Sequence, residues 1–119
     1  MKRLEVSPEL LRDPGWRAAL HIITSPTFRR NDARLWSHVD FEGRSLFFDK
    51  ILDEGTWSST EALMLRAAWS LFNQDCLVNL WGVVNWLSDD QAVTLLDAIA
   101  CAAFRHYVPK RGLLHEKKT

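Results

Sequence analysis

The sequence contains little cysteine, since only Cys76 and Cys101 occur among its 119 residues. Two cysteines are too few for the disulfide framework of a small secreted domain, and they lack the paired spacing of a zinc site. Each lies in a largely apolar stretch. We therefore expect both to be buried free thiols.

Long apolar runs are also missing. The most apolar windows, residues 77–87 and 98–104, are much shorter than the roughly 20 residues that cross a bilayer as a helix. The first five residues, MKRLE, are followed by charged and turn-forming residues instead of the apolar segment of a secretory signal. The sequence therefore predicts that no membrane is involved and that the protein is cytoplasmic.

Glycine is scarce and scattered. A phosphate-binding loop needs closely spaced glycines at the start of a helix, where backbone N–H groups can face the phosphate. The five glycines occur singly, as Gly15, Gly43, Gly55, Gly82 and Gly112. No nucleotide cofactor is expected.

Groups of metal ligands or catalytic side chains are equally sparse. The closest set, His38, Asp40 and Glu42, does not repeat at the spacing of a helical metal site, and Asp40 is better interpreted as a helix cap. No serine or cysteine lies in a recognisable nucleophile motif. We expect no metal and no catalytic residue, although a site assembled in space would leave no such signal.

The alternation of apolar and polar residues that marks half-buried strands is nowhere sustained, whereas helix start and stop signals recur along the chain. The composition, 47% hydrophobic and 25% charged, is that of an ordinary globular protein. These features predict an all-α fold, a compact bundle of about five helices. We assign residues 1–119 to a single domain that ends in a short basic tail, about 110–119.

The first helices are marked by Ser7-Pro8 and Asp13-Pro14, where a capping side chain precedes a proline at the first helical position. A further helix is expected over residues 40–54, capped by Asp40 and ended by Gly55. After the second start, four apolar residues share one helix face: Trp16, Ala19, Leu20 and Ile23.

Two longer helices begin with capping boxes. Ser58 precedes Glu61 by three residues and Ser88 precedes Gln91 by three, so each pair can satisfy N–H groups at a helix start. The helix over 59–73 is apolar around most of its circumference and is predicted to be the central helix. The helix over 89–107 carries a run of small residues at 98–103, which would let a neighbouring helix approach closely.

Between them a short helix is predicted over 80–87. Its expected core stripe has the spacing i, i+3, i+4, i+7, formed by Leu80, Val83, Val84 and Leu87. Trp81 and Trp86 lie on either side of that stripe, so they are either covered by neighbouring helices or presented to a partner. The partner-binding hypothesis assigns Trp81, Trp86, Asn85, Asp89 and Asp90 to the contact, because exposed tryptophan beside carboxylates is typical of binding hot spots.

Charge is unevenly distributed although the net charge is zero. Residues 36–104 contain ten acidic residues against three basic ones, and the flanking segments are basic. A helix-turn-helix over 80–106 is disfavoured, because its recognition helix would present Asp89, Asp90 and Asp97 to phosphates. Contact with nucleic acid through the basic arms stays open, and the residues for it are Arg29, Arg30, Arg34, Lys110 and Arg111.

Three functions follow in order of preference. The first is a non-enzymatic adaptor, regulator or inhibitor that binds another protein, with a basic partner favoured by the acidic body, or that binds a second copy of itself as a homodimer. The second is a nucleic-acid-associated regulatory protein that uses its basic arms. The third is a small enzyme whose site cannot be read from the sequence.

Overall fold

The computed structural model describes the backbone of residues 8–110 and, except at positions 30–32, the side chains of these residues. Most of the expected tail, including Arg111, lies outside the described residues. The α-helices are α1 (Pro8–Arg12), α2 (Pro14–Ile23), α3 (Asp32–Trp36), α4 (Phe48–Asp53), α5 (Ser59–Asn73), α6 (Leu80–Trp86) and α7 (Asp89–Ala103). A 3₁₀ helix, η1 (Pro26–Asn31), and two short strands, β1 (Val39–Asp40) and β2 (Ser45–Leu46), complete the order. The all-α prediction is confirmed apart from this small hairpin.

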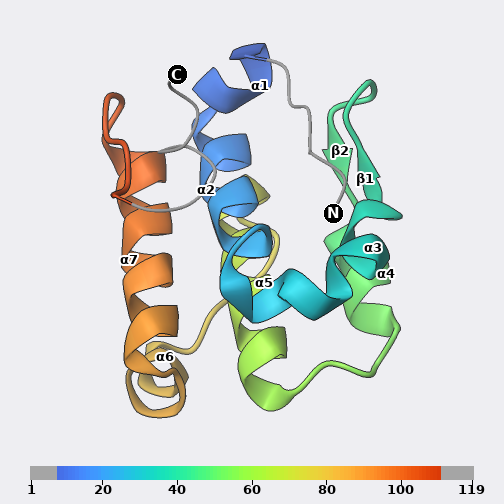
Figure 1. Ribbon diagram of the computed structural model, residues 1–119, viewed down its shortest axis with the longest axis vertical. Coiled ribbons are helices and arrows are strands. Elements are labelled where there is room, and N and C mark those ends of the chain that lie inside the picture. Colours follow the sequence, from blue (N-terminus) through green and yellow to red (C-terminus); the bar gives the residue numbers. More distant parts are fainter. Residues whose placement is uncertain (1–7, 111–119) are drawn as a thin grey trace.

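Helix α2 occupies the centre of the fold. Its N-cap is Asp13, whose Oδ1 accepts hydrogen bonds from the N–H groups of Gly15 (2.9 Å) and Trp16 (3.2 Å). Six consecutive residues, 18–23, are buried, so the helix is covered around its whole circumference and not only on the predicted face. The prediction that the 59–73 helix is central is therefore corrected: α2 lies between α5 and α7 and packs extensively against both (Figure 1).

Small residues allow these three helices to come close. Two helices can pack with axes about 8 Å apart only where the side chains at the contact are small. Alanines are buried on each of the three helices: Ala18 and Ala19 on α2, Ala67 and Ala68 on α5, and Ala98 on α7. Gly15 leaves no room for a side chain, because a Cβ atom at this position would come within 2.8 Å of the carbonyl oxygen of Phe72 on α5.

Aromatic rings join α2 and α5 to the hairpin and α4. The ring of Trp16 packs edge-on against Phe72, with centroids 5.3 Å apart, and lies 5.9 Å from the ring of Phe41 in the hairpin turn. Phe48 of α4 stacks on Trp69 of α5 at 6.1 Å. These contacts extend the core to the side of α5 that faces away from α7.

The helix predicted over 40–54 is wrong in its first half. Val39 pairs with Leu46 and Asp40 with Ser45 in an antiparallel hairpin, and α4 begins only at Phe48. Asp40 does accept a hydrogen bond from a backbone N–H three residues later, Gly43 at 2.9 Å, but this bond closes a turn and not a helix. Arg44 then adopts a left-handed conformation, with φ of 57°, which returns the chain into the second strand.

Both predicted capping boxes are present. The Ser58 hydroxyl accepts from the N–H of Glu61 at 3.1 Å and the Glu61 carboxylate accepts from the N–H of Ser58 at 2.9 Å. Ser88 and Gln91 make the same pair of bonds at the start of α7, at 3.2 and 3.0 Å. α7 ends at Ala103, earlier than the predicted 107, because Phe104 is already extended.

Two further expectations concern the thiols and the membrane. Cys101 is buried as predicted, whereas Cys76 is only half-buried because it lies in the connection between α5 and α6. Within residues 8–110, no helix combines the length and the apolar character that crossing a bilayer requires.

The two helical glycines provide a test of the close packing of α2. We expect Gly15→Ala to lower the free energy of unfolding by about 1–3 kcal/mol, because its Cβ would meet backbone of α5 that can only yield by moving the helix. Gly82→Ala is the matched control: its Cβ would lie 3.4 Å or more from Trp86 and Leu63, and alanine favours a helix interior by about 1 kcal/mol. Chemical denaturation measures both; a Gly15→Ala protein as stable as wild type would contradict the proposed close contact.

Candidate functional site

The candidate site is the exposed side of α6, which we call the α6 surface: Leu77, Leu80, Trp81, Val84 and Trp86. Their exposed fractions are 93%, 71%, 64%, 78% and 55%, so each of these large apolar side chains faces solvent. Both indoles that the sequence could assign either to the core or to a partner are open in the folded chain. An apolar group of this size on a monomer is typical of an interaction site.

The predicted core stripe of this helix is wrong at two of its four positions. Val83 and Leu87 pack partly against the core, but Leu80 and Val84 are exposed. The helix is only seven residues long, and it lies against Leu63 of α5 at Gly82. Only one side of the helix therefore contacts the core. The remaining apolar side chains have no described neighbour to cover them.

The α6 surface is held in place by local contacts. Asn79 caps the helix, with its Oδ1 accepting from the N–H groups of Trp81 at 2.8 Å and Gly82 at 3.3 Å. The side-chain amide of Asn85 donates to the carbonyl oxygen of Trp81 at 2.8 Å. The two indoles meet edge to face, with centroids 6.0 Å apart and planes at 85°, and the Trp86 ring lies over Gly82. In the folded chain the two indoles therefore pack on each other, and the Trp86 ring also packs on Gly82.

Carboxylates border this surface on one side. Asp89 and Asp90 lie in the first turn of α7, directly after α6, and both are exposed. Negative charge is favourable at a helix N-terminus, so their position is stabilising for the fold. The same two residues place acidic groups next to Trp86 in the sequence, as the partner-binding hypothesis requires.

Of the basic residues predicted to contact nucleic acid, those whose side chains the structure describes are not gathered on one surface. Arg29 and Lys110 are exposed, but η1 and the end of the described chain lie in different parts of the molecule (Figure 1). The side chain of Arg30 and the whole of Arg111 lie outside the described residues. Arg34 is held within the fold, so its guanidinium is not displayed as an open basic group.

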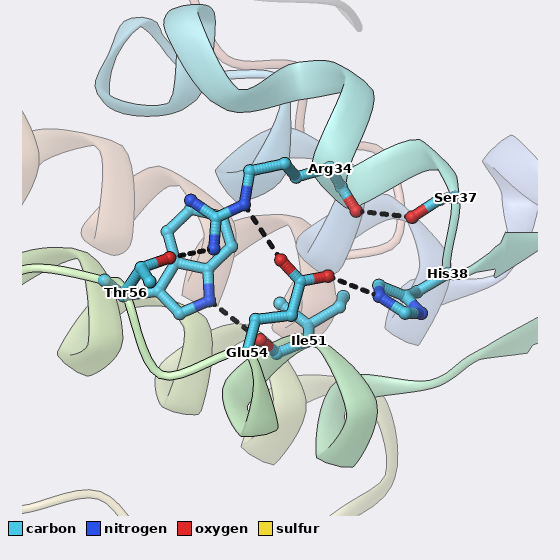
Figure 2. Close-up of polar contacts among 7 residues, drawn as sticks. Arg34, Ser37, His38, Ile51, Glu54 and Thr56 are labelled. Atoms are coloured by element: carbon cyan, nitrogen blue, oxygen red, sulfur yellow. Dashed lines mark hydrogen bonds and ion pairs between the residues drawn. The ribbon is translucent and has the colours of Figure 1, made fainter.

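Arg34 belongs to a polar cluster that ties α3 to the connection between α4 and α5 (Figure 2). Its Nε donates to Glu54 Oε1 at 2.8 Å, a second nitrogen donates to the Thr56 hydroxyl, and its guanidinium lies 4.1 Å from the ring centroid of Trp57. His38 Nε2 lies 2.7 Å from the other oxygen, Glu54 Oε2. Hydrogen bonds from His38 and Arg34 lower the pKa of the Glu54 carboxyl below its ordinary value of 4.5.

A His–Glu pair can also act in acid–base catalysis, but this one has the properties of a structural contact. Both of its side chains are partly exposed, and Glu54 also binds Arg34, whose guanidinium and carbonyl bond the hydroxyls of Thr56 and Ser37 (Figure 2). Trp57 completes the contact by donating from Nε1 to the carbonyl of Ile51 at 2.8 Å.

The fold also assembles a group of arginines that sequence reasoning missed. Arg12, Arg17 and Arg105 line a surface cavity of about 230 Å³ beside Cys101. Arg17 donates to the backbone carbonyls of Arg105 (3.3 Å) and Tyr107, so it holds the segment after α7 against α2. No local pattern links Arg105 to Arg12 and Arg17, because 88 positions separate it from Arg17.

The titratable groups near this cavity do not form a nucleophilic site. Cys101 is buried, and burial raises the pKa of its thiol more than Arg17 lowers it, which disfavours the reactive thiolate. Tyr107 donates to Asp97 Oδ1 at 2.6 Å, and this bond raises the pKa of the phenol. Among the described residues, His, Cys, Asp and Glu side chains do not come together in threes as a metal site.

Comparisons of the chain with models of protein families, with characterised proteins and with solved structures find no match in any of the three. The interpretation of the site therefore depends on its own geometry.

The Glu54 cluster predicts a specific dependence of stability on pH. A carboxyl whose pKa is lowered by folding adds stability above its ordinary pKa, and that contribution is lost as the pH falls through the folded-state value. We therefore expect Glu54→Gln to lower the thermal midpoint at neutral pH, with the difference from wild type shrinking as the pH falls below 4.5.

The matched control is Asp53→Asn, which removes a neighbouring exposed carboxylate and leaves the bonds of Glu54 to Arg34 and His38 in place. Calorimetry across this range measures the effect. A Glu54→Gln difference that stays constant down to pH of about 3 would show that the carboxylate charge is not what stabilises the cluster.

Proposed function

We propose that this protein is a non-enzymatic interaction module, an adaptor, regulator or inhibitor that binds another protein through the α6 surface. The observation that carries the proposal is the exposure of Trp81 and Trp86 together with Leu80 and Val84 in a folded chain. Burying a large aromatic side chain in a partner contributes several times more binding energy than an average contact, and tryptophan is enriched at such positions.

The order of the α6 surface supports the same function. Side chains that are already fixed lose little conformational entropy on binding. The Asn79 cap, the Asn85 bond and the contact between the two indoles hold the surface in one arrangement. Asp89 and Asp90 add negative charge at its border, which favours a basic partner through faster encounter and correct orientation.

The nucleic-acid alternative has less support. Arg34 is bound to Glu54 and Thr56, and the remaining described members of that set, Arg29 and Lys110, are isolated exposed charges. Affinity that falls steeply with added salt would favour this alternative. The cytoplasmic location and the regulatory role stay predictions.

The α6 surface is tested by comparing two double variants in a pull-down from the native host. Trp81→Ala/Trp86→Ala removes the two indoles, and Phe104→Ala/Val108→Ala removes two exposed apolar side chains elsewhere. We expect one protein to be retained by wild type and by the second variant but not by the first. Its affinity, measured by calorimetry, should fall by about 30-fold or more when the indoles are removed.

Folding is the control in this experiment. Since both tryptophans are exposed, their removal should leave the thermal midpoint and the helical content close to wild type. Unfolding of the double tryptophan variant would assign the indoles to the core. Full retention of the partner by that variant would exclude the α6 surface as its contact.

A further inference from the structure

Helix α7 has two apolar faces, and residues 8–110, which the structure describes, cover only one of them. Its inner face packs against α2 and α5 through Leu95, Ala98 and Cys101, which are buried. Because successive residues of a helix are rotated by about 100°, a second set of apolar residues lies on the opposite side of α7. We call it the outer stripe: Ala92, Val93, Leu96, Ile99, Ala100 and Ala103.

The outer stripe is open to solvent. Leu96 is 64% exposed, Val93 43% and Ile99 41%. α7 stands at one edge of the molecule, with α2 and α5 on its inner side only (Figure 1). A helix that is apolar on opposite faces is normally covered on both, because exposing such a stripe to water is unfavourable.

The spacing of the outer stripe is that of a helix-pairing surface. Residues 92, 96, 99 and 103 are separated by four, three and four positions, the alternation that places side chains along the seam between two helices. The stripe has alanine at both ends and Leu96 in the middle, so a second helix can approach closely. The outer stripe therefore has the geometry to pack against another helix.

The charges at the two ends identify which helix. Asp89 and Asp90 lie at the N-terminal end of α7, and Arg105, also exposed, lies just beyond its C-terminal end. If a second α7 packs antiparallel to the first, its Arg105 lies near the acidic pair of the first copy. Its own acidic pair then lies near Arg105 of the first copy. The two helix dipoles are then also aligned favourably. A parallel arrangement would instead bring like charges together.

We infer that two copies of this chain form a homodimer through antiparallel packing of their outer stripes. The two-fold axis passes between Leu96 and Ile99, so Leu96 of each copy meets Ile99 of the other, and each acidic pair meets the other copy's Arg105. A closed two-fold contact of this kind uses the same patch on both copies. The inference does not depend on the proposed function: Asp89 and Asp90 border both surfaces, but none of the five apolar residues of the α6 surface takes part in the dimer contact.

The test is the mass of the full chain in solution, measured by sedimentation equilibrium from roughly 1 to 100 μM. Wild type should approach twice the 13.8 kDa of one chain. Leu96→Glu places a carboxylate on each side of the axis, against the apolar residues of the other copy, and should give a monomer with unchanged helical content. Val84→Glu is the matched control, since it adds the same charge at an apolar position on α6 that is even more exposed than Leu96, and it should stay dimeric.

Charge reversal tests the orientation. Asp89→Lys/Asp90→Lys and Arg105→Glu should each weaken the dimer by about tenfold, and combining all three changes should restore it. A monomeric wild type over the whole range, a dimer that survives Leu96→Glu, or one that is lost with Val84→Glu would overturn the inference. Absence of rescue in the triple variant would overturn the antiparallel arrangement. The double tryptophan variant should remain dimeric, which separates this test from that of the proposed function.

Discussion

The burial of α2 between α5 and α7 is the constraint on which the rest of the structure depends. An uninterrupted buried segment, residues 18–23, can exist only if neighbours cover every side of the helix. Alanines on the three helices and Gly15 against Phe72 make that close approach sterically feasible. The inner faces of α5 and α7 therefore pack against α2. Any apolar residues on the other sides of these two helices must be covered by other parts of the chain or by a partner.

The apolar residues outside these inner faces are covered to different extents on the two sides of the molecule. On the side away from α7, the hairpin and α4 supply rings that pack on Trp16, Trp69 and Phe72, and the Arg34–Glu54 cluster fixes the segment that follows. On the side of α7, the described chain adds the short helix α6, the segment after Ala103 and a hydrogen bond from Gln91 to Thr27 of η1. Apolar residues of α6 and α7 consequently remain at the surface, and both proposals arise from them.

Features set by neighbouring residues could be predicted from the sequence. The capping boxes at Ser58 and Ser88 and the Asp13 cap on α2 depend on contacts within three positions, and all three form. Asp40 shows the limit of this reasoning. An aspartate that accepts a hydrogen bond from an N–H three residues later starts a helix in one context and closes a turn in another, and the following Gly43 and Arg44 favoured the turn.

Features set by the number of neighbours could not be predicted. Periodicity identified an apolar face on α2 but not that the helix would be surrounded, and it assigned Leu80 and Val84 to the core because it assumed a neighbour along the whole of α6. The exposure of Trp81 and Trp86 was left open for the same reason. The cavity lined by Arg12, Arg17 and Arg105 exists only after α1, α2 and the end of α7 have come together.

Native-state hydrogen exchange tests the central position of α2 most directly. If α5 and α7 both pack on this helix, its amides between Ala18 and Ile23 should exchange only through global unfolding and should be the slowest in the chain, while those of α6 exchange through local opening. Amides of α2 that exchange faster than those in the middle of α5 and α7 would show that the fold is organised around a different helix.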